Sequence, residues 1–229
     1  MKTRYFFRRG YLVGAALLVL AGQVLAQVPA FDRAIACGNG PSGYGGPQRM
    51  LVDGQGNTYV VGSFTGTVLF GNTLLTAPGP SVPGQLPPSD KFIAKLDAAG
   101  SYLWAVQLGG QTYDSVTGLC ADAVGNVYLT GYFFSFSITF GSGGPTLYNS
   151  SAQGEAFVAK LNGTTRQWQW ARRFGGIYDD YGQAIAVNAA GEVFVAGNVL
   201  SGTADFGPIT LTSFTALNGC WAKLDANGT

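Results

Sequence analysis

The chain has 229 residues, of which 47% are hydrophobic and only 11% are charged, and its formal net charge is +1. Its 35 glycines and a 13% share of aromatic residues are typical of a turn-rich β protein rather than a helical one. The near-zero charge argues against a nucleic-acid partner, because phosphate binding needs a clustered basic surface.

Residues 1–26 have the pattern of an export signal. The basic segment MKTRYFFRRG precedes the apolar run YLVGAALLVL, and VLA before Gln27 fits a small-residue cleavage site. We therefore expect cleavage near Ala26 and a product that is secreted or held in the cell envelope. A short membrane anchor is the alternative, although the apolar run is short for a span. No transmembrane segment is expected in the mature chain.

Residues 27–48 form an N-terminal region that precedes the repeats described next. The segment FDRAIACGNG from Phe31 predicts a divergent strand. This strand could close the last repeat by supplying its fourth strand.

From residue 49 onward, the chain repeats itself with a period of about 66 residues. The phrase VDGQGNTYVVGSF returns as ADAVGNVYLTGYF and as VNAAGEVFVAGNV. Later phrases such as FIAKL, FVAKL and CWAKL follow in the same order each time. The repeats cover about 49–114, 115–180 and 181–229, and the last lacks the Trp-bearing segment that ends the other two. Recurrence of several phrases in one order predicts tandem structural units.

The sequence of each repeat predicts four short strands, because short segments rich in β-branched and aromatic residues are separated by residues typical of turns. The long Pro-rich and Gly-rich connection at residues 71–90 predicts a surface loop with a possible edge hairpin. Four-stranded units in tandem indicate an all-β fold of β-propeller blades. A β-solenoid is the alternative, although its coils are usually shorter and more even.

The phrases DAVGNVYLTGYF, FVAKLN and WARRFGGIYDDYGQAIAVNAAGEVFVAG resemble the bacterial β-propeller repeat family labelled SBBP. The resemblance covers most of residues 49–227. It implies an exported protein, often of the cell envelope, whose repeats form blades, and it implies no catalytic residue. About three blades are fewer than the usual 4–8, so we expect a short member or part of a larger propeller. Its unfinished blade edge could pair with another chain.

The chain contains no histidine, which removes Ser-His-Asp and Cys-His catalysis and His-ligated metals. We therefore expect a binding scaffold without catalysis, cofactor or metal.

The acids Asp53 and Asp122 resemble calcium-loop residues, but one acid per turn supplies too few oxygens. These turns are predicted to be structural, with a left-handed glycine. The glycines inside the second strands, Gly62, Gly131 and Gly197, indicate a bulge or a close neighbour. Three cysteines, Cys37, Cys120 and Cys220, leave the disulfide state open.

The segments GGQTYDS and GGIYDDYG join successive repeats and are predicted to share a face with the long loops. Possible contacts to an unknown glycan or protein ligand there are Tyr113, Asp114, Tyr178, Asp179, Asp180 and Tyr181. Tyrosine could stack on a ligand while aspartate accepts hydrogen bonds. In a second interpretation, Asp114 and Asp180 only cap the turn. The alternative function is a carboxylate-dependent glycan lyase or hydrolase, which would need these aspartates to converge in one pocket.

Overall fold

The structure is a computed structural model that describes residues 33–38, 40, 43, 45–78, 89–212 and 218–229. All its strands lie in the compact unit formed by residues 35–229. The predicted signal at 1–26 and its cleavage site lie outside the described residues. Among the residues that are described, no helix is long and apolar enough to cross a membrane.

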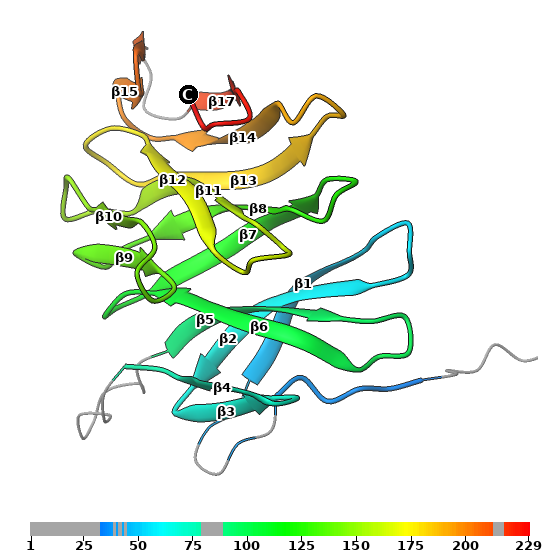
Figure 1. The fold of residues 1–229 in the computed structure, drawn as a ribbon. Coiled ribbons are helices and arrows are strands. Elements are labelled where there is room, and N and C mark those ends of the chain that lie inside the picture. The colour runs from blue at the N-terminus through cyan, green and yellow to red at the C-terminus, as the bar shows by residue number, and fades with distance from the viewer. Residues whose placement is uncertain (1–32, 39, 41–42, 44, 79–88, 213–217) are drawn as a thin grey trace, which may run out of the picture. The chain divides into compact units, whose positions relative to one another are not determined.

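The strands follow the predicted repeats. Repeat 1 consists of β1 (Gly45–Val52), β2 (Thr58–Thr65), β5 (Ser89–Leu96) and β6 (Tyr102–Gly109). Repeat 2 consists of β7 (Asp114–Ala121), β8 (Val127–Phe133), β11 (Glu155–Leu161) and β12 (Trp168–Phe174). Repeat 3 shows β13 (Asp180–Val187), β14 (Val193–Val199) and β17 (Asn218–Leu224). In each repeat, successive strands pair in antiparallel order, and the three sheets follow one another in Figure 1.

A hairpin interrupts the connection between the second and third strands of every repeat. The three hairpins are β3 (Thr67–Phe70) with β4 (Thr73–Thr76), β9 (Ser137–Phe140) with β10 (Thr146–Tyr148), and β15 (Thr203–Phe206) with β16 (Ile209–Thr212). The predicted edge hairpin is thus confirmed. The hairpins also connect repeats, because β9 pairs with β6 of repeat 1 and Asp205 bridges to Gly175 after β12.

The core lies largely between successive sheets. Ile93 of repeat 1 and Leu129 and Phe157 of repeat 2 belong to one buried cluster, and Val158 and Val195 belong to the cluster between repeats 2 and 3. Burying the apolar face of each sheet against the next is the main stabilising effect in this arrangement.

The recurring turn after the first strand is structural, as predicted. Asp53 Oδ1 accepts the backbone N–H groups of Gln55 at 3.0 Å and Asn57 at 2.9 Å. Gly56 then takes a φ of 81°, and Gly125 has a φ of 87°. The aspartate therefore holds a turn that requires a left-handed glycine.

The glycines inside the second strands are explained by close neighbours. A Cβ built on Gly131 would lie 1.9 Å from the carbonyl oxygen of Ser115. Next to this contact, the facing strand has a register shift between Val116 and Gly118. Repeats 1 and 3 have the same shift opposite Gly62 and Gly197. Both parts of the prediction, a bulge and a close approach, are confirmed.

The N-terminal region differs in part from the predicted boundaries. Residues 33–38 form no strand, and β1 begins at Gly45, so residues 45–48 belong to repeat 1. Closure of the last repeat by an N-terminal strand stays a prediction. The three cysteines are free and half-buried. Cys37 and Cys120 pack against apolar clusters, and Cys220 Sγ donates to the carbonyl oxygen of Gly197 at 3.6 Å.

Candidate functional site

The link between repeats 1 and 2 lies beside the connection that carries the β9–β10 hairpin. The backbone N–H of Thr112 donates to Ser135 Oγ at 2.9 Å. The backbone N–H of Phe134 donates to the carbonyl oxygen of Tyr113 at 2.9 Å. The two kinds of loop therefore share a face, as predicted. We call this side of the molecule the loop face.

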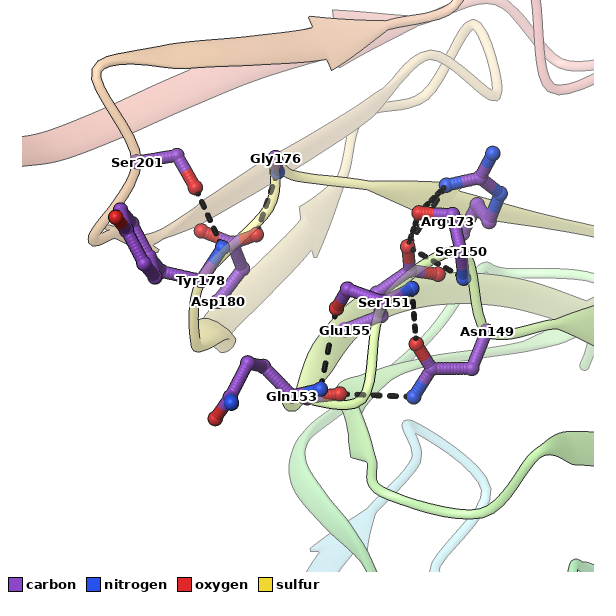
Figure 2. Close-up of polar contacts among 10 residues, drawn as sticks. All are labelled: Asn149, Ser150, Ser151, Gln153, Glu155, Arg173, Gly176, Tyr178, Asp180 and Ser201. Atoms are coloured by element: carbon purple, nitrogen blue, oxygen red, sulfur yellow. Dashed lines mark hydrogen bonds and ion pairs between the residues drawn. The ribbon is translucent and has the colours of Figure 1, made fainter.

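The link between repeats 2 and 3 is closed in the same way. The backbone N–H of Tyr178 donates to Ser201 Oγ at 2.9 Å, and that of Leu200 donates to the carbonyl oxygen of Asp179 at 3.3 Å. Figure 2 shows Ser201 reaching toward Tyr178 from the neighbouring connection. Because the bonds recur at equivalent positions, they belong to the repeat rather than to a single site.

Asp114 and Asp180 hold the glycine pair that opens each link. The backbone N–H of Gly110 donates to Asp114 Oδ2 at 2.7 Å, and that of Gly176 donates to Asp180 Oδ2 at 2.6 Å (Figure 2). The two side chains are 1% and 0% exposed. Both aspartates therefore cap the link through backbone hydrogen bonds.

The first glycine of each link provides space for a carboxylate. A Cβ on Gly109 would lie 2.2 Å from Asp90 Oδ1, and one on Gly175 would lie 2.1 Å from Asp180 Oδ2. A real Cβ does not approach an oxygen so closely. The first glycine of each pair is thus required by a buried acid.

A pair of buried carboxyl groups occupies the first junction. Asp90, near the start of β5, accepts a hydrogen bond from Gln107 Nε2 at 3.1 Å. Its Oδ1 and the Oδ1 of Asp114 have no hydrogen-bond partner among the described residues. Burial, reinforced by the charge of Asp114, raises the pKa of Asp90 to about 7. Burial also raises the pKa of Asp114. At mildly acidic pH the pair therefore retains a proton.

The second junction contains an ion pair at the equivalent place. Arg173 Nη1 donates to Glu155 Oε1 at 2.8 Å, and the backbone N–H of Ser150 donates to the same oxygen at 3.1 Å (Figure 2). Burial, with smaller effects from Glu155 and Asp179, raises the pKa of Asp180 to about 6. An arginine thus neutralises one acid here, where the first junction has the uncharged Gln107.

Four aromatic side chains gather between the two links. Tyr113 lies 6.1 Å from Tyr132 and 6.3 Å from Phe134, measured between ring centroids. Tyr132 in turn lies 4.8 Å from Tyr181. Tyr113 is 60% exposed and the other three are half-buried. We call Tyr113, Tyr132, Phe134 and Tyr181 the aromatic patch. Lys91 Nζ lies 5.8 Å from the Tyr113 ring centroid.

The structure therefore divides the six predicted site residues. Tyr113 and Tyr181 join the aromatic patch, and Asp179 lies nearby, accepting the backbone N–H of Gly154 through Oδ1 at 2.8 Å. Tyr178 is exposed but makes no ring contact with the patch among the described residues. Ligand binding by any of them stays a prediction.

Sequence reasoning missed Tyr132 and Phe134. Tyr132 lies in the predicted second strand of repeat 2, and Phe134 follows directly after that strand, in the segment GYFF. Repeat 3 has the polar Asn198 at the position of Tyr132 and Leu200 at that of Phe134. This difference between repeats was the available signal.

The aromatic patch offers ring faces for stacking, with a lysine and an aspartate close by. In the described part of the chain, no cluster of three or more Cys, Asp or Glu side chains could hold a metal ion. A groove of about 720 Å³, lined by Asp90, Gln107 and Trp168, lies between repeats 1 and 2. Asp114, Asp179 and Asp180 do not line this groove. The carboxylate-dependent glycan enzyme stays an alternative prediction.

Residues 103–132 match the family model of the SBBP β-propeller repeat. The matched segment runs from β6 through the first link into β8, so it spans the junction between repeats 1 and 2. The resemblance drawn from the phrases is confirmed, and the all-β repeats are β-propeller blades. No curated protein matches the chain.

Proposed function

We propose that this propeller chain is an exported binding scaffold that holds a glycan on its loop face, at the aromatic patch. The observation that carries the proposal is the clustering of Tyr113, Tyr132, Phe134 and Tyr181 beside exposed loops. Sugar rings present apolar C–H faces that stack on aromatic rings, and their hydroxyl groups can bond to neighbouring polar side chains.

Several features support a binding rather than a catalytic role. The recurring acids Asp114 and Asp180 are buried and engaged in capping the links. The chain contains no histidine for proton transfer at neutral pH. The patch itself carries only aromatic rings, with Lys91 and Asp179 at its border.

Export is part of the proposal and rests on residues 1–26. Expression with this segment intact, followed by mass spectrometry of the released protein, tests it. A new N-terminus at Gln27 is the expected result. Retention of the whole segment inside the cell would contradict export.

Binding to a glycan array, followed by titration of any hit, tests the patch. Tyr113→Ala should weaken binding at least tenfold, equivalent to about 1.4 kcal/mol. Tyr178→Ala is the matched control, because Tyr178 is 56% exposed on the same face but lies outside the patch. Equal binding by both variants would remove the patch from the proposal. Turnover of a bound glycan would favour the enzymatic alternative.

A further inference from the structure

The outer edge of β17 has a different environment from the third strands of the other repeats. β5 lies between β2 and β6, and β11 lies between β8 and β12. Among the described residues, β17 pairs with β14 only. One edge of β17 thus presents backbone N–H and C=O groups that can pair with another strand.

Repeats 1 and 2 show what a fourth strand supplies at this place. Its first aromatic residue packs on the Phe of the hairpin: Tyr102 lies 5.8 Å from Phe70, and Trp168 lies 5.0 Å from Phe140. Both pairs are edge-to-face, a favourable arrangement for aromatic rings. The contact therefore joins the fourth strand to the hairpin of its own repeat.

The second aromatic residue of the fourth strand packs on the second strand. Trp104 lies 6.2 Å from Tyr59, and Trp170 lies 6.4 Å from Tyr128. In each case a bulge between the two aromatic residues sends them to opposite faces of the sheet. The shared pattern is an aromatic residue, one further residue, and then Trp-Ala.

Repeat 3 has aromatic residues at both positions against which the fourth strand packs in repeats 1 and 2. Phe206 ends β15 as Phe70 and Phe140 end their strands, and Phe194 faces Lys223 as Tyr128 faces Lys160. Phe206 stacks on Phe174 of the preceding repeat at 5.3 Å between ring centroids, and among the described residues no fourth strand of repeat 3 contacts Phe206 or Phe194. The receiving positions of repeats 1 and 2 are thus preserved in repeat 3.

A groove follows the free edge. It has a volume of about 490 Å³, and its walls include Phe206, Leu211, Trp221 and Leu224. Trp221 is 70% exposed, whereas Ile93 at the equivalent position of repeat 1 is buried against the sheet of repeat 2. The groove lies beside the free edge, because residues of β17 form part of its wall.

The rim of the groove is basic. Arg172, Arg173 and Lys223 line it. Glu155 pairs with Arg173 and Glu192 pairs with Lys223, while Arg172 has no carboxylate partner in the described structure. A neutral or acidic segment is therefore favoured over a basic one.

We propose that the free edge of β17 binds an extended segment of a partner polypeptide by strand addition. The segment is neutral or acidic and carries the aromatic–x–Trp–Ala pattern. Its backbone extends the β13–β14–β17 sheet, its first aromatic side chain enters the groove against Phe206, and its Trp covers Phe194. This surface is separate from the aromatic patch.

The probe is a synthetic peptide with the β6 sequence of residues 101–109, flanked by glutamates, titrated into the whole chain by calorimetry. Hydrogen exchange locates the contact. We expect saturable binding, with slower exchange for the β17 amides. Replacing the Tyr and Trp of the peptide by Ser, or methylating its backbone nitrogens, should abolish binding. Trp221→Ser in the protein should weaken binding about tenfold, and Tyr113→Ala should leave it unchanged.

The charge argument has its own comparison. A peptide of residues 166–174, which contains three arginines, should bind more weakly than the β6 peptide, most clearly at low salt. Unchanged exchange of the β17 amides at millimolar β6 peptide would overturn the proposal. A dimer of the chain that Trp221→Ser dissolves and the peptide does not compete with would also overturn it, in favour of self-pairing.

Discussion

Replacing Asp90 by Asn should flatten the pH dependence of stability. Asp90 is buried and its pKa is raised from the ordinary value of 3.8 to about 7. Between these values the native state holds a proton that the unfolded chain releases. The free energy of unfolding therefore falls as pH rises through this window. At about 1.36 kcal/mol per pH unit, the loss attributable to Asp90 is on the order of 4 kcal/mol.

Asn at this position keeps an acceptor for Gln107 and removes the charge that burial disfavours. Near pH 4 the variant should be about as stable as the parent chain. At pH 8 it should be more stable, by up to the amount given above. Denaturant unfolding followed by tryptophan fluorescence at pH 4, 5, 6, 7 and 8 measures the difference. Asp180, whose pKa burial raises to about 6, adds a slope of the same sign to both proteins.

The control is Asp205→Asn, at an exposed carboxylate of the β15–β16 hairpin whose side chain accepts a hydrogen bond from Thr210. This variant should retain the full decline in stability between pH 4 and 7. Parallel profiles for Asp90→Asn and the parent chain would refute the assignment of the retained proton to Asp90.

Three further substitutions test the structural roles of recurring residues, each by denaturant unfolding. Gly131→Ala places a Cβ 1.9 Å from a carbonyl oxygen of the facing strand and should lower the free energy of unfolding by about 2–3 kcal/mol. Gly46→Ala is the control and should be near neutral, because a Cβ there has nothing within 4 Å. Equal effects of the two substitutions would contradict the steric argument. Ser135→Ala leaves the N–H of Thr112 without its acceptor and should cost about 1–2 kcal/mol. Asp122→Ala removes the acceptor that closes the recurring turn, and a loss of about 1–2 kcal/mol is expected, with the fold retained in circular dichroism.

The strand order could be predicted from the sequence because its determinants are local. The turn after the first strand needs a hydrogen-bond acceptor and a left-handed glycine, and both are recognisable in the sequence as Asp53 and Gly56. Gly131 indicated a close neighbour, because only a residue without a side chain leaves room for the carbonyl oxygen of the facing strand. The recurrence of these residues in each repeat showed that they were not placed by chance.

The candidate site was harder to predict from the sequence, because it depends on contacts between repeats. Asp90 and Asp114 belong to different sheets, and nothing local to Asp90 indicates that the two meet. Tyr132 resembles any aromatic strand residue until the structure places it 4.8 Å from Tyr181 of the next repeat. The exposure of Trp221 likewise depends on the absence of a further sheet packed on it among the described residues, not on its own sequence context.

The hydrogen bonds that close each link have a consequence for how the molecule unfolds. Ser135 and Ser201 each fasten a link to the connection of the repeat that follows it, so stability is divided into similar contributions between nearest neighbours. Among the described residues, repeat 2 is fastened in this way on both sides and repeat 3 on one side only, and a repeat with fewer neighbour contacts opens more readily. Amides of β14 and β17 should then exchange with solvent before those of β8 and β11, which belong to the repeat held on both sides.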